Sequence, residues 1–363
     1  MRTHWAKASF LFGFLFSLYF LLAIFFASVL NYDFMRSDVL LYWNESLAWM
    51  TPFNEHPPLY TLAIALARGL TFNLLDPVLL MMGLNLLSFL GCAWLLMKFF
   101  KRAGLKQEYA AWGVLLFALW PLVGLTYTVV PLADIPSILL ALIGILMLQK
   151  ARHPLAGLFF GLAIVAHKGV WPIIGLVALA DFYTRKKYFS KRNLAFVAIM
   201  LLPLSALWLA GIPYHQSINW FMESSLEVNT SLGGGYPILD GLFGTFQEGG
   251  LKNWVKGAVI LFFILLTLFS LFVSLKLRFK YYELCVAISL AVLIMFLFSS
   301  AATIWGPVRF SRFLVFPLIF FFNAHHGLQI SKRVSFSLGA IAVFVLFISQ
   351  LAYAWYIAFV FFA

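Results

Sequence analysis

Two aspartates are the residues best suited to chemistry in this chain. Asp38 stands in the polar stretch 31–56, which follows the first apolar run, and Asp134 stands between Pro131 and Pro136. A carboxylate near a membrane surface can act as a general base, or it can hold a hard cation such as Mg²⁺ or Mn²⁺. The structural alternative for both residues is that the acid caps a helix.

Cationic residues occur in comparable places. Lys168 lies in "AHKG" between two short apolar runs, and Arg309 and Arg312 lie in "WGPVRFSR" before a later run. A charge at the depth of lipid head groups is costly unless it is paired or meets an anion, so these residues are candidates for binding a phosphate. Alternatively, each side chain extends its charge to water along its own apolar stem.

The composition indicates which kind of secondary structure carries these residues. The chain has 363 residues, of which 63% are hydrophobic and 10% charged, and its mean hydropathy is +0.96. This balance excludes a soluble globular domain. Continuous apolar runs of about 20 residues predict an all-α polytopic membrane protein and exclude a β-barrel, whose strands alternate.

We predict about eleven membrane spans. They cover 8–30, 78–99, 109–130, 135–150, 154–166, 169–184, 193–212, 254–275, 282–300, 312–329 and 335–359. The apolar segment 57–72 is short and begins at a Pro-Pro step, so we interpret it as an interfacial or re-entrant helix.

The basic residues indicate topology rather than nucleic-acid binding, despite a net charge of +12. With the N-terminus in the cytoplasm, most of the 25 Lys and Arg lie inside and most of the 13 Asp and Glu lie outside. This is the expected bias for inner loops. The candidate acids and cations then share the outer face. A transporter would carry its polar residues near the middle of its spans, which here are almost purely apolar.

Four motifs in order resemble the GT-C glycosyltransferases. The first outer loop contains Asp38, Tyr42-Trp43 and then the step His56-Pro57-Pro58-Leu59, and it is followed by "ADIPSILLALIGI", "LAGLFFGLAIVAHKGVWPIIGLVALA" and "RFSRFLVFPLIFF". The branch it is most similar to is the dolichyl-phosphate-mannose protein mannosyltransferase-like group, which includes the lipid A aminoarabinose transferases. The usual acid pair of the first loop is replaced here by Ser37-Asp38.

The resemblance implies an inverting glycosyltransferase that moves a sugar from a polyprenyl-phosphate donor to a lipid, glycan or protein acceptor. It implies catalytic roles for Asp38 and Asp134. The implied contacts to the donor phosphate are His56, Lys168, Arg309 and Arg312, and those to the substrate are Tyr42, Trp43, Tyr60 and His167. Mg²⁺ or Mn²⁺ between Asp38 and Asp134 is one alternative, and charge stabilisation by the cations without a metal is the other.

We expect a single transmembrane domain over 1–363 without a soluble C-terminal domain. It would comprise a catalytic half, 1–184, with the first outer loop 31–76, and a variable half, 185–363, with the outer loop 213–253. We expect a bacterial inner membrane with the active site on the outer face. A glycolipid-anchor-type mannosyltransferase is the alternative within the class, and a lipid or polysaccharide transporter or flippase is the alternative of another class.

Overall fold

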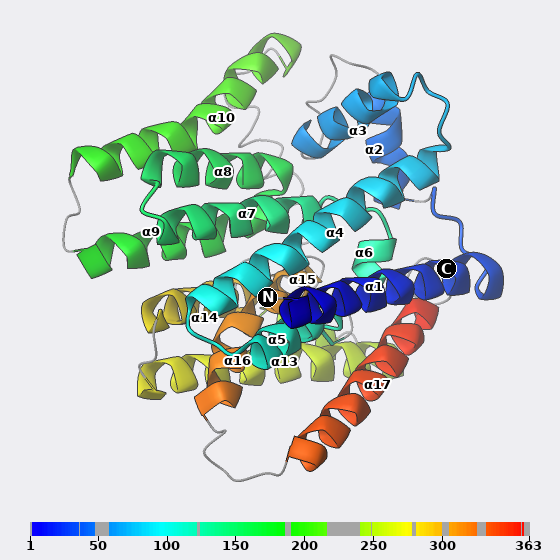
Figure 1. Ribbon diagram of the computed structural model, residues 1–363. Coiled ribbons are helices and arrows are strands. Elements are labelled where there is room, and N and C mark those ends of the chain that lie inside the picture. Colours follow the sequence, from blue (N-terminus) through cyan, green and yellow to red (C-terminus); the bar gives the residue numbers. More distant parts are fainter. Residues whose placement is uncertain are drawn as a thin grey trace. The chain divides into compact units, whose positions relative to one another are not determined.

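The described parts of the chain are mostly helical and contain no strand (Figure 1). The computed structural model describes residues 2–35, 37–47, 58–121, 124–185, 190–215, 240–247, 249–277, 281–299, 305–324, 332–356 and 358. Four helices are long and apolar enough to cross a membrane, namely Ser9–Val29, Pro77–Arg102, Lys191–Ile212 and Asn253–Lys276. The all-α class is therefore as predicted, whereas the number of eleven spans stays a prediction.

The chain divides into two compact units. The first contains Met1–Pro52, Leu59–Leu139 and Phe322–Ala363. Its helices are α1 (Arg2–Ile24), which continues into the π-helix η1 (Phe25–Val29), α2 (Ser37–Leu47), α3 (Pro58–Leu70), α4 (Pro77–Arg102), α5 (Gln107–Ala118), α6 (Thr126–Val129), the start of α7 (Asp134–Gln149) and α17 (Lys332–Tyr356).

The second unit contains Phe53–Pro58 and Leu140–Phe321. It holds the rest of α7, then α8 (His153–Ala166), the 3₁₀ turn η2 (Lys168–Val170), α9 (Trp171–Arg185), α10 (Lys191–His215), α12 (Asp240–Gln247), α13 (Gly250–Leu277), α14 (Tyr282–Leu297), α15 (Trp305–Phe310), the 3₁₀ turn η3 (Ser311–Leu314) and most of α16 (Val315–Ala324).

The predicted span 109–130 is not one helix. Helix α5 ends at Ala118, and α6 begins only at Thr126. Pro121 cannot donate a backbone hydrogen bond, which disfavours helix through this point. Gly124 approaches the chain so closely that a Cβ atom there would overlap the carbonyl oxygen of Ala118. The break therefore depends on residues that an apolar pattern does not register.

Helix α17 satisfies the polar groups that this break leaves. Gln350 Nε2 donates to the carbonyl oxygen of Trp120 at 2.9 Å, and Thr126 Oγ1 donates to Gln350 Oε1 at 3.2 Å. Buried backbone groups need such partners. The side chain of Gln350 in α17 thus forms hydrogen bonds on both sides of the irregular stretch between α5 and α6.

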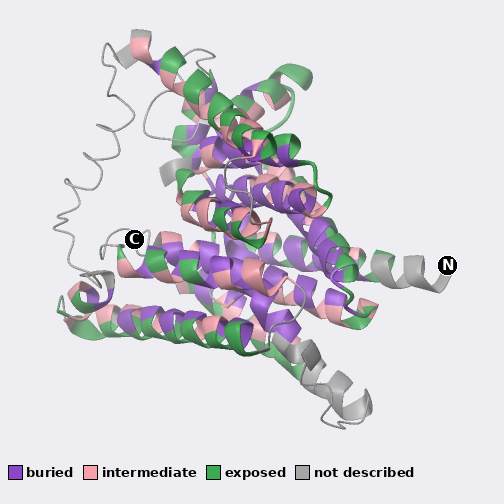
Figure 2. Ribbon diagram, turned by 90° about the vertical axis from the view of Figure 1, so that its left-hand side faces the viewer, coloured by how far each residue is buried: buried purple, intermediate pink, exposed green. Residues whose placement is uncertain are grey.

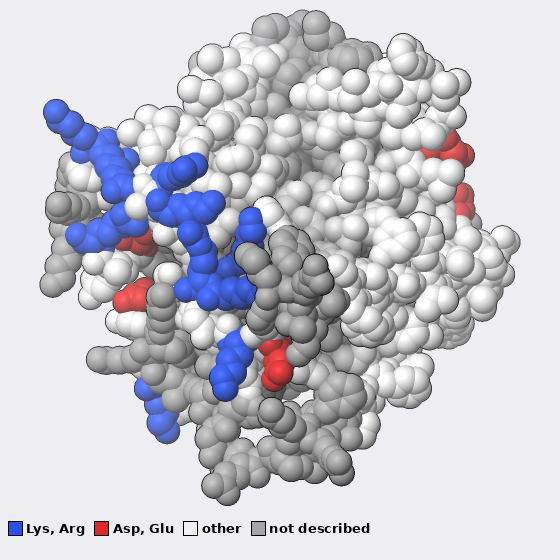
Figure 3. Space-filling model, in the orientation of Figure 1, with Lys and Arg blue, Asp and Glu red and all other residues white. Residues whose placement is uncertain are grey.

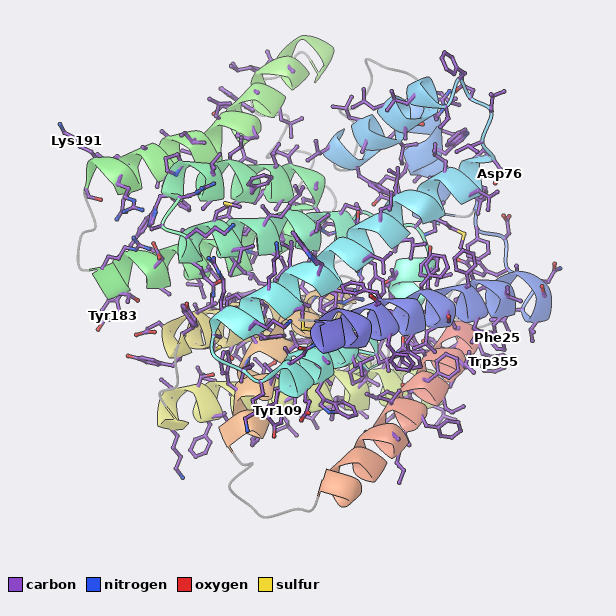
Figure 4. All side chains as sticks on the ribbon, in the orientation of Figure 1. Phe25, Asp76, Tyr109, Tyr183, Lys191 and Trp355 are labelled. Carbon is purple, nitrogen blue, oxygen red and sulfur yellow. The ribbon has the colours of Figure 1, made fainter. Side chains whose placement is uncertain are left out.

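Helix α4 begins with an aspartate cap followed by a proline. The side chain of Asp76, labelled in Figure 4, accepts hydrogen bonds from the backbone N–H of Val78 at 2.9 Å and of Leu79 at 3.2 Å. Pro77 occupies the first helical position, where its missing N–H costs nothing. This carboxylate therefore has a capping role and lies exposed.

In the second unit, α8 and α10 pack side by side (Figure 1). Gly157 and Gly161 lie one turn apart on α8, and a Cβ atom on either would overlap a carbonyl oxygen of α10, that of Phe196 or of Met200. Small residues at this spacing let the backbones of membrane helices come close. We refer to this contact as the α8–α10 seam.

Apolar side chains cover much of the outer surface of the helices. The most hydrophobic window of α10 is only 11% buried, and the burial view shows exposed residues along many helices (Figure 2). The exposed side chains of α10 include Leu194, Leu201, Leu202 and Leu209. Apolar exposure of this extent is typical of surface covered by lipid.

Candidate functional site

Two of the predicted site residues fall partly or wholly outside the described residues. His56 lies outside them, and so does the side chain of Asp38, although its backbone belongs to α2. Helix α2 begins at Ser37, so Asp38 stands in its first turn rather than ahead of it. The roles of Asp38 and His56 therefore stay predictions, and the site is built below from the other residues.

In the first unit, Tyr42, Tyr60, Asn85 and Asp134 form a group that we call the Tyr60 cluster. The Tyr60 hydroxyl donates to Asn85 Oδ1 at 3.0 Å. The ring of Tyr60 meets the ring of Tyr42 edge to face, with the ring centroids 5.1 Å apart. Tyr60 and Asp134 are each 2% exposed. Three of the residues chosen from sequence are thus placed together inside one unit.

Asn85 holds this cluster to the start of α7. Its Nδ2 atom donates to the carbonyl oxygen of Leu132 at 3.1 Å and lies 3.5 Å from that of Thr128. Leu132 comes two residues before Asp134, so the amide fixes the chain just ahead of the carboxylate. Because α7 begins at Asp134, the helix dipole favours a negative charge on this side chain.

The electrostatics of Tyr60 indicate the same proximity. Helix α3 is not among the helices long enough to cross a membrane. Burial raises the pKa of the Tyr60 hydroxyl far above its ordinary value, and the charges of Tyr19 and Asp134 act in the same direction. The phenol therefore stays protonated and remains a hydrogen-bond donor beside an acidic group.

Trp43 has a structural partner that sequence reasoning did not foresee. The guanidinium carbon of Arg68 lies 4.8 Å from the centroid of the Trp43 ring. Arg68 Nη1 also donates to the carbonyl oxygen of Ser46 at 2.8 Å. These contacts join α3 to α2, so Arg68 orients the helix that carries Asp38 and Tyr42. A contact between Trp43 and substrate stays a prediction.

In the second unit, the two predicted cationic segments contact each other. The ring of His167 packs edge to face on Phe310, with centroids 5.1 Å apart. A Cβ atom on Gly169 would come within 2.7 Å of the Phe310 ring, so this approach needs a glycine. His167 Nδ1 accepts from the N–H of Gly169 at 3.0 Å, which fixes its ring.

We call the residues on these two segments, His167, Lys168, Arg309 and Arg312, the cationic cluster. Lys168 is exposed, and His167 and Arg309 are half-buried. Arg312 is only 1% exposed and ranks among the largest buried side chains. A buried guanidinium is costly without compensating groups. Three of the predicted phosphate ligands, Lys168, Arg309 and Arg312, thus occupy two contacting segments that are far apart in the sequence.

The described side chains do not by themselves offer a metal site. Among them, no group of three His, Cys, Asp or Glu residues could hold an ion. Asp134 would need Asp38 as a further ligand, and the side chain of Asp38 lies outside the described residues. Binding of Mg²⁺ or Mn²⁺ stays a prediction, and no step below is assigned to a metal.

Asn85 is the residue of this region that sequence reasoning missed. It is completely buried and connects α3, α4 and the chain before α7. Asn85 could have been recognised from the sequence, because it is a lone amide within the apolar run 78–99. A polar side chain inside such a run marks a partner within the protein.

Comparisons of the chain with family models, with curated proteins and with solved structures gave no match.

Proposed function

We propose that this chain is a GT-C-type integral-membrane glycosyltransferase. It would move a sugar, with inversion, from a polyprenyl-phosphate donor to a lipid, glycan or protein acceptor on the outer face of the membrane. The observation that supports this proposal best is the Tyr60 cluster, because Tyr42 and Tyr60 of the first outer loop and Asp134 of the second motif converge within one unit.

In this mechanism Asp38 is the general base. It takes the proton of an acceptor hydroxyl while that oxygen attacks the anomeric carbon of the sugar. The bond between this carbon and the phosphate oxygen breaks, and the phosphate keeps the bonding electron pair. The sugar then passes through a transition state with oxocarbenium character, which a nearby carboxylate stabilises.

Asp134 is suited to that second, stabilising role. It is nearly buried, and the N-terminus of α7 favours its charged form. A charge held in a place with little water acts more strongly on a developing positive charge than one in solvent. The protonated Tyr60 hydroxyl, fixed by Asn85, keeps this environment ordered.

The cationic cluster would stabilise the departing polyprenyl phosphate. Lys168 is exposed and Arg309 half-buried, so both have solvent-accessible surface with which to meet an anion. Their contribution grows as negative charge develops on the leaving group. His56 would add to it, as the resemblance implies.

The test is sugar transfer by the purified chain in detergent. Labelled polyprenyl-phosphate mannose, hexose and arabinose would be offered with a total lipid and cell-wall extract, with and without EDTA. Asp38→Asn and Asp134→Asn should each lower the rate by about 100-fold or more. Asp76→Asn is the matched control, because it changes an exposed capping acid to an equally good cap.

Transfer that persists in Asp134→Asn, within about twofold of the unchanged chain, would overturn the role of this carboxylate. Transfer from the mannose donor alone, onto a glycolipid, would favour the glycolipid-anchor-type alternative. Absence of product from every donor, together with translocation of a lipid that depends on Asp38, would favour the transporter.

A further inference from the structure

The second unit contains a pocket of about 290 Å³ that takes no part in the proposed transfer. It lies between the C-terminal parts of α7 and α9 and the first turn of α14. Its apolar wall includes Ile145, Val177 and Leu284. The polar groups that line it are Gln149, Asp181, Thr184, Arg185, Tyr281 and Glu283. We call this the Gln149 pocket.

Gln149 gives the strongest sign that the pocket receives a ligand. Its Oε1 and Nε2 atoms are both buried, and neither has a hydrogen-bond partner within the described part of the chain. Leaving such a group unpaired costs free energy of folding. A molecule that both donates and accepts hydrogen bonds would pair with this amide.

The charges of the lining offer separate places for a cation and an anion. Asp181 Oδ1 accepts from Arg185 Nε at 3.1 Å and from Nη2 at 3.0 Å. The other oxygen, Oδ2, lies 3.2 Å from Nε2 of His153. Arg185 thus balances Asp181, and Glu283 adds one further negative charge to the lining. The Arg185 side chain is 31% exposed, so it can still meet an anion.

The surroundings of the pocket resemble a membrane interface. Tyr183 near the end of α9, labelled in Figure 4, is 67% exposed. Tyr281 precedes α14 as its N-cap residue, and Tyr282 is the first residue of the helix. Tyrosine is enriched at head-group depth. Lys and Arg gather on one part of the surface (Figure 3). Lys150 and Arg152 lie between α7 and α8, and Lys191 and Arg192 begin α10. The charge bias predicts that this is the cytoplasmic side.

We infer that the Gln149 pocket binds the head group of a phospholipid that carries both a primary ammonium and a phosphate. The ammonium would meet Glu283 and donate to Gln149 Oε1, and the phosphate would meet Arg185 and accept from Gln149 Nε2. The volume is near the lower limit of small-molecule sites and suits a head group alone. The acyl chains would lie along the apolar surface of α9, where Leu179 is 57% exposed.

The experiment measures lipid binding to the full-length chain by native mass spectrometry in detergent. Phosphatidylethanolamine, phosphatidylglycerol, phosphatidylcholine and soluble phosphoethanolamine would be titrated separately. Glu283→Gln should weaken binding of phosphatidylethanolamine about three- to fivefold, which is the size expected for one partly exposed ion pair. Gln149→Leu should weaken it further.

Glu108→Gln is the matched control. Glu108 and Glu283 both stand in the first turn of a helix, so the two variants lose the same interaction with the helix dipole. The control should leave lipid binding unchanged within about twofold. Equal effects of Glu108→Gln and Glu283→Gln would overturn the proposal, as would equal binding of the three phospholipids by the unchanged chain. Binding of phosphoethanolamine as tight as that of the lipid would replace the lipid with a soluble ligand.

Discussion

Asn85 and Gln149 are two buried amides in apolar helices, and they differ in how their hydrogen bonds are used. Both ends of the Asn85 amide are paired, with Tyr60 on one side and the carbonyl oxygen of Leu132 on the other. Neither end of the Gln149 amide has a partner within the described residues. A paired amide fixes the protein around it, whereas an unpaired one in a pocket is suited to a ligand. A buried amide can thus either stabilise the fold, as Asn85 does, or remain open to a ligand, as we propose for Gln149.

The largest expected effect comes from removing the paired amide, that of Asn85. Asn85→Leu should lower the free energy of unfolding by about 3 kcal/mol, because it leaves the Tyr60 hydroxyl and the Leu132 carbonyl buried without partners. Thermal and denaturant unfolding in detergent would measure the loss. Tyr60→Phe should cost less, about 1 kcal/mol, since it removes one hydroxyl and keeps the contact with Tyr42. A loss below 0.5 kcal/mol (roughly the scatter of neutral changes) in Asn85→Leu would contradict the role of this amide.

The second effect concerns His153, which precedes the predicted span 154–166 and is fully buried beside the Gln149 pocket. Burial lowers its pKa below the ordinary value of 6.5, Arg185 and Arg192 act in the same direction, and Asp181 and the Ala151 carbonyl oppose them.

Because the folded-state pKa of His153 is lowered, the unfolded chain takes up the proton first. Stability should therefore fall as the pH drops through 6.5 towards the folded-state pKa. His153→Phe should flatten this part of a pH series of melting temperatures. A dependence on pH that is the same in both proteins would show that His153 does not cause it.

The smallest expected effect comes from removing the unpaired amide, that of Gln149. Without added lipid, Gln149→Leu should change the free energy of unfolding by less than about 0.5 kcal/mol, or should raise it slightly, because it removes a buried polar group that has no partner in the described chain. With phosphatidylethanolamine, the unchanged chain should gain more thermal stability than the variant. A marked loss of stability without lipid would indicate that this amide has a structural partner instead.

Much of the fold was predictable because apolar runs map directly onto helices. The predicted spans 154–166 and 169–184 coincide closely with α8 and α9, and the short segment 57–72 is α3. The break within 109–130 was not predicted, because it depends on a glycine contact and on the distant Gln350, neither of which changes hydropathy.

The candidate site was predictable where a residue type is rare in its surroundings. Asp134 and Arg312 stand out as charges in apolar sequence, and both are buried. The partners that hold such residues were harder to find, because Asn85 and Arg68 act through contacts with residues distant in the chain. Trp43 illustrates the same point, since its aromatic ring is as suited to Arg68 as to a sugar.

The α8–α10 seam has a consequence for how this chain tolerates change over time. Lipid gives little drive for apolar helices to associate, so the attachment of α10 depends on how closely two backbones can approach. The space between the α8 backbone at Gly157 and Gly161 and the backbone of α10 is too small for one methyl group. Selection would therefore act most strongly on the two positions of the seam that have no side chain, while the exposed leucines of α10 could be exchanged for other apolar residues.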